Sequence, residues 1–233
     1  MNPHDTTLTR STAVPLPRTG SAGALAPEVQ RVLRNTYGLL GLTLLFSAAV
    51  AAGTAALGLP HPGLVITLFG SFGLLYATAK LAHSGWGLLA VFALTGFMGY
   101  TLGPVIGRVL SFPGGAQVVT MALAATAVTF FALSAYVLTT RRDFGFMGGF
   151  LFAGMVIALL AAIGAYAFEV PALALAVSAI VVLLSAGLIL FETSRIVSGG
   201  ETNYVMATVG LYVSIFNLFS ALLSLFGTGV GDD

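Results

Sequence analysis

Long apolar runs separated by short polar segments dominate the sequence. A helix needs roughly 20 apolar residues to cross the hydrocarbon layer of a bilayer, which is about 30 Å thick. Seven runs reach or approach this length, and the second is the shortest. The pattern predicts an all-α, polytopic membrane protein with seven transmembrane helices, at approximately Tyr37–Leu57, Gly63–Ala79, Gly85–Ile106, Val118–Leu138, Phe144–Phe168, Val170–Phe191 and Tyr204–Phe226.

The fifth and sixth runs are nearly continuous. Between Phe144 and Phe191 the only charged residue is Glu169. A single helix over this stretch would be roughly 70 Å long at 1.5 Å per residue, more than twice the thickness of the hydrocarbon layer. We therefore expect the chain to fold back at Glu169-Val170-Pro171, with Pro171 in the first turn of the next helix.

The composition agrees with a lipid environment. Hydrophobic residues make up 58% of the chain and charged residues 7%, against about 25% in a typical soluble domain. The net charge of +1 gives no overall field that would attract nucleic acid, and the absence of cysteine excludes disulfides and cysteine-ligated metals.

Residues 1–30 are rich in polar and small residues and are expected to form a flexible cytoplasmic tail without a signal peptide. Residues 31–228 form the predicted membrane domain, and 229–233 a short C-terminal tail outside the cytoplasm.

The distribution of Lys and Arg predicts the orientation. With the N-terminus in the cytoplasm, Arg108 is the only basic residue outside. The cytoplasmic side then holds Arg10, Arg18, Arg31, Arg34, Lys80, Arg141, Arg142 and Arg195. An odd number of spans places the C-terminus on the opposite side, next to the acidic pair Asp232 and Asp233.

The last run carries a face of small and polar residues. Its members recur at alternating intervals of three and four: Ala207, Gly210, Ser214, Asn217, Ala221 and Ser224. Lipid supplies no hydrophobic force between helices, so small residues and interhelical hydrogen bonds drive their association. We expect this face to pack against other helices, with Asn217 bonded to a partner. Lining of an aqueous path is the alternative role.

Catalytic and cofactor chemistry finds little support. A retinal Schiff base needs a lysine inside a span, and the only lysine, Lys80, lies at a predicted helix end. His61 and His83 fall in loops on opposite sides of the membrane, so they cannot share a metal, and every Asp lies outside the spans. We therefore predict a protein that is not an enzyme and has no catalytic, cofactor or metal site.

The stretch LILFETSRIV holds the most notable charges. Glu192 follows a long apolar run and precedes Arg195 by three residues, so the two can pair on one helix face. One interpretation is an ion pair at the membrane interface. The other is a proton or ion sensor, because burial of a carboxyl disfavours its charged form. Further on, Glu201-Thr202-Asn203 is expected to open the last helix, with Thr202 or Asn203 as its cap.

Several longer stretches resemble the Bax inhibitor-1 family, and most closely its bacterial branch of FtsH protease modulators. They are VLRNTYGLLGLTLLFSA (Val32–Ala48), WGLLAVFALTGFMGYTLGP (Trp86–Pro104), SAYVLTTRRD (Ser134–Asp143) and LFETSRIVSGGETNYVMATVGLYVSIFNLFSALLSLFG (Leu190–Gly227). The resemblance implies a protein of the bacterial inner membrane with a cytoplasmic N-terminus and a central seventh helix. It also implies either of two activities: binding and modulation of the membrane protease FtsH, or a pH-sensitive calcium or proton leak gated by acids on helices six and seven.

The match at the acidic positions separates these two activities. Glu192 falls where leak-type members carry their first acid, whereas this sequence reads LYVS where they carry the second, so Ser214 stands in its place. A serine cannot share a proton with Glu192, and a calcium site needs six to eight oxygens, usually from several carboxylates. The resemblance therefore favours the protease modulator. Calcium binding belongs only to the alternative, in which Glu192, Ser214, Asn217 and Arg195 are the candidate sensing residues.

Overall fold

The protein is a bundle of seven long helices in a computed structural model that describes residues 25–228. Each helix is long and apolar enough to span a bilayer, and no strand occurs in the described range. The helices are α1 (Pro27–Ala56), α2 (Leu64–Leu81), α3 (Gly87–Leu110), α4 (Gly115–Thr140), α5 (Gly148–Ala167), α6 (Pro171–Val197) and α7 (Tyr204–Thr228), with a short 3₁₀ turn, η1 (Gly145–Met147), before α5. The predicted all-α fold is confirmed.

The boundaries follow local sequence signals. Pro27 and Pro171 each occupy the first turn of a helix, where the missing N–H of proline costs nothing. The chain folds back between α5 and α6 as expected, and Glu169 adopts a positive φ of 53° in that turn. α1 begins at Pro27, ten residues before the apolar run that predicted it and inside the segment 1–30 assigned to the tail. The rest of that tail, residues 1–24, and the C-terminal tail 229–233 lie outside the described residues.

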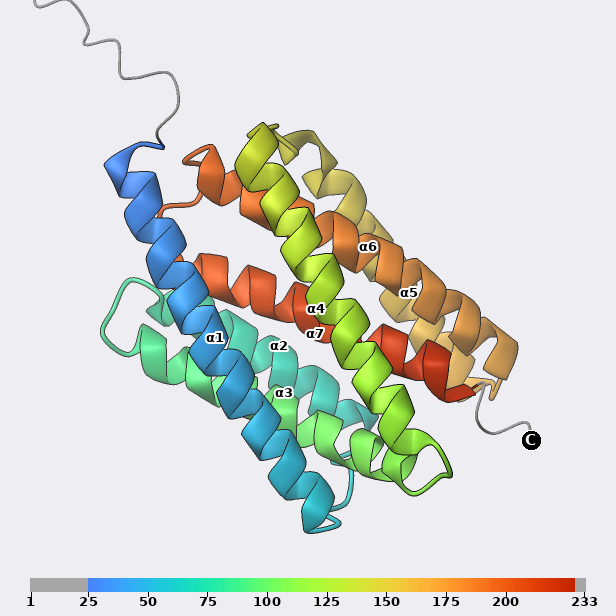
Figure 1. Ribbon diagram of the computed structural model, residues 1–233. Coiled ribbons are helices and arrows are strands. Elements are labelled where there is room, and N and C mark those ends of the chain that lie inside the picture. The colour runs from blue at the N-terminus through green and yellow to red at the C-terminus, as the bar shows by residue number, and fades with distance from the viewer. Residues whose placement is uncertain (1–24, 229–233) are drawn as a thin grey trace, which may run out of the picture.

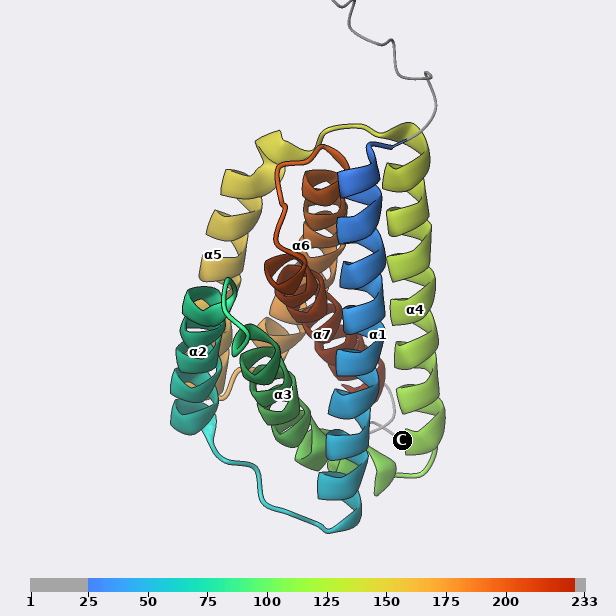
Figure 2. The same ribbon diagram turned by 90° about the vertical axis from the view of Figure 1, so that its left-hand side faces the viewer.

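The seventh helix lies at the centre of the bundle. It runs obliquely between α1, α3, α4 and α6 and packs against all four, as both ribbon views show (Figure 1, Figure 2). In its membrane-spanning window 56% of the residues are buried, against 6% for α2 and 11% for α5. The central seventh helix that the family resemblance implied is confirmed, and the outer helices present large apolar side chains such as Phe69, Phe150 and Leu183 to the surroundings.

Hydroxyl side chains inside the spans mostly bond within their own helix. Thr54, Thr78, Thr126 and Thr208 each donate to a backbone carbonyl four residues earlier. This arrangement satisfies the hydroxyl without a partner on another helix. Polar residues that leave this pattern are therefore informative. One set lies where α6 meets α7, and another joins α7 to α1 and α3.

Candidate functional site at the junction of α6 and α7

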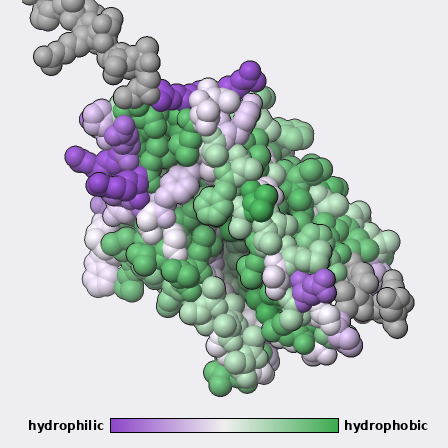
Figure 3. Space-filling model, viewed as in Figure 1, coloured by the Kyte–Doolittle hydropathy of each residue, from purple (hydrophilic) through white to green (hydrophobic). Residues whose placement is uncertain are grey.

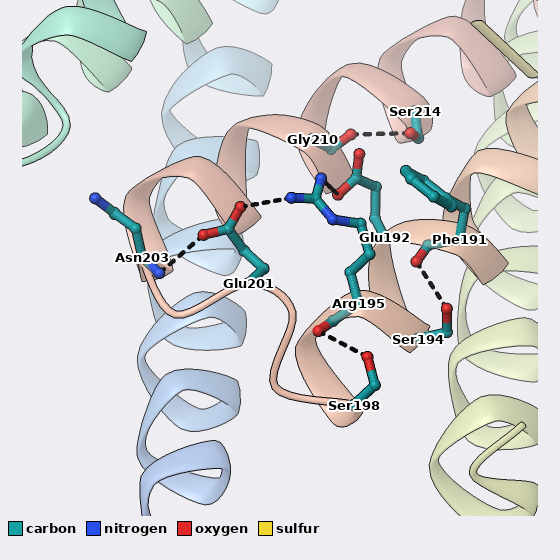
Figure 4. Close-up of polar contacts among 9 residues, drawn as sticks. All are labelled: Phe191, Glu192, Ser194, Arg195, Ser198, Glu201, Asn203, Gly210 and Ser214. Carbon is teal, nitrogen blue, oxygen red and sulfur yellow. Dashed lines mark hydrogen bonds and ion pairs between the residues drawn. The ribbon is translucent and has the colours of Figure 1, made fainter. Parts of the chain in front are cut away.

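A three-membered charge cluster joins the end of α6 to the start of α7. The guanidinium of Arg195 lies between two carboxylates (Figure 4). Its Nη1 is 3.6 Å from Glu192 Oε2, and its Nη2 donates to Glu201 Oε2 at 3.1 Å. The predicted pairing of Glu192 with Arg195 is present, but the shorter contact is with Glu201, which the sequence assigned only to the start of the last helix.

The cluster is largely enclosed. The side chains of Glu192 and Glu201 are 15% and 16% exposed, and that of Arg195 is 37% exposed. The guanidinium also lies over the ring of Phe191, 5.5 Å from its centroid, a distance typical of a cation–π contact. Enclosed carboxylates need a compensating charge, since an unpaired charge shielded from water is costly. Arg195 supplies that charge to both acids.

The glycine at position 210 allows α7 to approach Glu192. A Cβ atom at Gly210 would lie 2.7 Å from the carboxyl carbon of Glu192 and 2.9 Å from each of its oxygens. Any side chain at this position would therefore displace the carboxylate. The hydroxyl of Ser214, one turn further along, donates to the carbonyl of Gly210 at 2.9 Å. Glu192, Gly210 and Ser214 thus lie together, whereas the sequence had placed Gly210 only on a packing face.

Asn203 ties this junction to a second loop. Its Oδ1 accepts the N–H groups of Val205 and Met206, which confirms it as the cap of α7. Its own N–H donates to Glu201 Oε1 at 2.9 Å. Its Nδ2 donates to the carbonyl of Ala82 at 3.0 Å and lies 3.3 Å from His83 Nδ1. One side chain thereby fixes the start of α7 and holds the loop between α2 and α3.

Small and polar residues continue along the contact between α6 and α7. The hydroxyls of Ser178 and Ser224 are hydrogen-bonded at 3.2 Å, near the other end of the pair. The register that joins Glu192 to Gly210 and Ser178 to Ser224 places Ser185 level with Asn217. Ser185 is fully buried and its hydroxyl has no hydrogen-bond partner among the residues described. We call these residues, Ser178, Ser185 and Glu192 on α6 with Gly210, Asn217 and Ser224 on α7, the polar seam.

The predicted packing face of α7 is only part of its buried surface. Ala207, Ser214 and Ala221 are buried, Gly210 and Asn217 are half-buried, and Ser224 is exposed. Bulky residues on the other faces, including Leu211 and Leu218, are buried as well, because helices surround α7 on several sides. No side-chain hydrogen bond of Asn217 is seen within residues 25–228, so the partner expected for it stays a prediction.

Tyr212 is a buried polar residue whose role the sequence did not reveal. Its hydroxyl lies 2.6 Å from Ser47 Oγ of α1 and donates to the carbonyl of Thr95 on α3 at 3.2 Å. Tyr212 is 1% exposed and so links three helices in the core. No spacing in the sequence indicates this link, since Ser47 and Thr95 lie more than a hundred residues away in the chain.

Within the described part of the chain, no group of three or more His, Asp or Glu side chains has the geometry to hold a metal ion. Glu192 and Glu201 are the two acids that approach each other here, and Arg195 lies between them, where a cation would have to bind. The cluster is thus built to neutralise its own charges.

Comparison with known proteins places the chain in a protein family. The family model described as "Inhibitor of apoptosis-promoting Bax1" matches residues 29–231. An uncharacterized protein of Pseudomonas aeruginosa is 53% identical over 213 residues, which cover 91% of this chain and 96% of that protein. The protein named "Modulator of FtsH protease YccA" of Escherichia coli is 53% identical over 200 residues, 86% of this chain and 91% of that protein. An uncharacterized membrane protein of Vibrio cholerae is 43% identical over 86% of this chain and 90% of its own length.

Proposed function

Because this chain belongs to the Bax inhibitor-1 family, we propose that it is a regulatory protein of the bacterial inner membrane that binds an FtsH-type protease. It restrains the proteolysis of membrane proteins and catalyses no reaction itself. The observation that carries this proposal is the identity with the Escherichia coli modulator of FtsH protease, which extends over nearly the whole of both chains. The corresponding protein of a second Escherichia coli strain, O6:H1, is named "Inner membrane protein YccA", and this name supports the assignment to the inner membrane.

The proposed orientation has the N-terminus in the cytoplasm and the C-terminus outside. Arg31 and Arg34 at the start of α1 lie at the same end of the bundle as Arg141 and Arg142 after α4, and α6 brings Arg195 toward that end (Figure 1). This gathering of basic residues supports a cytoplasmic assignment for that end. The charge cluster of Arg195 then lies near the cytoplasmic surface, within reach of the cytoplasmic parts of a membrane-anchored protease.

The division of labour that we propose follows from the domain assignment. The membrane domain, 31–228, docks beside the protease in the bilayer, while the tail, 1–30, reaches the protease from the cytoplasm. Residues 1–24 precede every described helix, so their deletion removes no helical residue. It should weaken co-purification with the protease or change the half-life of this protein. Unchanged co-purification and half-life would assign the binding to the membrane domain alone.

Crosslinking in native membranes tests the proposal directly. A tagged version of this chain is crosslinked, purified and scored for an FtsH-type protease, with an unrelated seven-helix protein of equal abundance as the control. In parallel, the half-life of a membrane substrate of the protease is followed with and without excess of this chain. We expect specific capture of the protease and a longer substrate half-life. Failure of both would refute the proposed function.

The polar seam favours a second function, a proton or cation leak. Ser178 and Glu192 are fourteen residues apart on α6, so the seam runs roughly 21 Å along the helix, most of the way across the hydrocarbon layer. Glu192 would be its sensor, with Ser214 and Asn217 as neighbouring polar groups. The position of Arg195 between the two acids argues against Ca²⁺ as the ion. Under this alternative the Glu192→Gln protein in liposomes loses the pH dependence of cation flux; equal flux through mutant, wild type and empty liposomes removes it.

A further inference from the structure

A deep groove separates α1 from α4. It has a volume of about 980 Å³, and its walls are α1 and α4. The aromatic side chains of Tyr212, Phe216 and Phe219 on α7 form its floor, and residues of α3 from Leu102 to Leu110 also line it. The two wall helices stand apart and are linked by a ring contact between Tyr37 and Phe130, with centroids 5.9 Å apart. Figure 3 shows the hollow in the apolar face of the molecule.

Small residues on α1 keep the groove open. Gly41, Ala48 and Ala52 line it and are exposed, and a Cβ atom at Gly41 would have no neighbour within 4 Å. Larger side chains, among them Leu45 and Phe131, stand at its rim with exposed fractions of 71% and 67%. The lining reaches from Tyr37 to Ala56 along α1, a length of roughly 28 Å at 1.5 Å per residue, close to the thickness of the hydrocarbon layer.

Two arginines of α1 lie beyond the end of the groove marked by Tyr37 and Phe130. Arg34 precedes Gly41 by seven residues, and residues seven apart lie on nearly the same face of a helix. Arg34 lies one turn beyond Tyr37, and Arg31 nearly one turn further. Hydrophilic residues gather at the end of the bundle where α1 begins (Figure 3).

The charge at this end suits an anion. Glu28 is the acid in the first turn of α1, and Asp143 lies in the loop after α4, where one of its oxygens accepts the N–H of Gly145. The ion pairs seen within residues 25–228 do not include Arg31 or Arg34. Cytoplasmic basic residues in general set the orientation of a membrane protein. Arg31 and Arg34 differ from other basic residues in their position, because the apolar groove begins at Tyr37, one helical turn after Arg34.

We propose that the groove between α1 and α4 binds an anionic phospholipid of the cytoplasmic leaflet, with its phosphate at Arg34 and Arg31 and one acyl chain between the two helices. One leaflet is about 15 Å deep, half of the hydrocarbon layer, so the chain extends from the level of Tyr37 to about that of Ala48. Basic residues between helices at the cytoplasmic surface are a common form of lipid recognition. The leaflet named here rests on the proposed orientation, whereas the site itself does not.

Native mass spectrometry of the purified full chain tests the site. The protein in detergent is titrated with phosphatidylglycerol and, separately, with phosphatidylcholine, and the fraction carrying one lipid is measured. We expect a single phosphatidylglycerol to be retained preferentially. Arg34→Gln combined with Arg31→Gln should weaken its retention about tenfold or more, the effect of losing a charge-assisted hydrogen bond to phosphate.

A second pair of variants separates the groove from the surface charge. Ala48→Phe fills the groove without changing any charge and should reduce phosphatidylglycerol retention to a similar extent. Ala49→Phe adds the same side chain at an exposed neighbour that does not line the groove, and it should bind lipid like the wild type. Thermal unfolding of each variant without added lipid verifies that it is folded.

Equal retention of both lipids, or equal retention by the Ala48 and Ala49 variants, overturns the proposal. If Ala48→Phe instead releases a co-purified protein and leaves lipid retention unchanged, the groove belongs to a partner helix and the proposal is wrong.

Discussion

Two pairs of helices in this bundle carry stripes of small residues, and the stripes serve opposite purposes. Between α6 and α7, Gly210 lets the helices approach until the carboxylate of Glu192 lies where a Cβ would be. Between α1 and α4, Gly41 and Ala48 face an open groove. Small residues permit close packing in membranes, but they do not by themselves reveal which partner approaches.

Polar groups distinguish the two pairs. The seam between α6 and α7 contains a serine pair, a charge cluster and an asparagine cap, all within the chain itself. The lining of the groove is mainly apolar, and the basic residues Arg31 and Arg34 lie beyond its end on α1. The first pair is complete in this chain, whereas the second has the features of a site that is completed by another molecule.

Matched glycine substitutions give the largest expected difference between the two pairs. Gly210→Leu forces the Glu192 carboxylate and α6 away from α7, and should lower the free energy of unfolding by about 3 kcal/mol, the upper end of typical overpacking. In Gly41→Leu the new side chain points into the groove, and the free energy of unfolding should change by less than about 0.5 kcal/mol. Denaturant unfolding in a single detergent measures both. Similar losses in the two variants would show that the groove is closed in solution.

Arg195→Gln tests whether the charge cluster holds the junction of α6 and α7. The substitution leaves two enclosed carboxylates without their shared cation, and we expect a loss of about 1–2 kcal/mol, reduced from the cost at a fully buried site because Arg195 is partly exposed. Adding Glu201→Gln to this variant should restore part of the stability, since one uncompensated charge is removed. Arg142→Gln, on the loop after α4, is the control. A double variant that is simply additive would contradict a coupled cluster.

Much of this architecture could be predicted from the sequence because it depends on chain-local signals. Apolar run length predicts the spans, Pro171 marks the turn before α6, and Asn203 caps α7 from its own neighbours. The pairing of Glu192 with Arg195 follows from their spacing on one helix. Each of these features needs only residues a few positions apart.

The features that the sequence did not predict depend on contacts between distant segments. Glu201 reaches Arg195 because the loop after α6 turns back through Gly199, which has a φ of 77°. Tyr212 joins α1 and α3 through Ser47 and Thr95. The groove exists because α1 and α4 both pack on α7 and meet each other at the ring contact of Tyr37 with Phe130. Periodicity gives the buried face of a helix but not the identity of its neighbour. For the same reason, the partner of Asn217 stays a prediction.

Asn203→Ala removes the cap of α7 together with its link to the loop between α2 and α3. Loss of a helix cap typically costs about 1 kcal/mol, and the loop link to Ala82 is lost with it. The exposed Thr202 supplies the control, because Thr202→Ala leaves both contacts in place. Hydrogen exchange should increase at the start of α7 and near His83 in the Asn203 variant only. An increase confined to α7 would show that the loop between α2 and α3 is held by other contacts.

Ser185→Ala has the smallest expected effect on stability, and it tests whether the polar seam conducts protons or cations. The hydroxyl of Ser185 is fully buried and has no partner in the described range, so its removal breaks no hydrogen bond and should change the free energy of unfolding by less than about 0.5 kcal/mol. If the seam conducts protons or cations, the same substitution interrupts it midway between Glu192 and Ser178, and flux in liposomes should fall although the protein is as stable as before. If the protein acts only on a protease, both flux and protease binding should be unaffected. Ser134→Ala is the matched control, because it removes a buried hydroxyl of α4 that also has no partner in the described range and does not belong to the seam. A fall in flux in that variant as well would show that the flux does not depend on the seam.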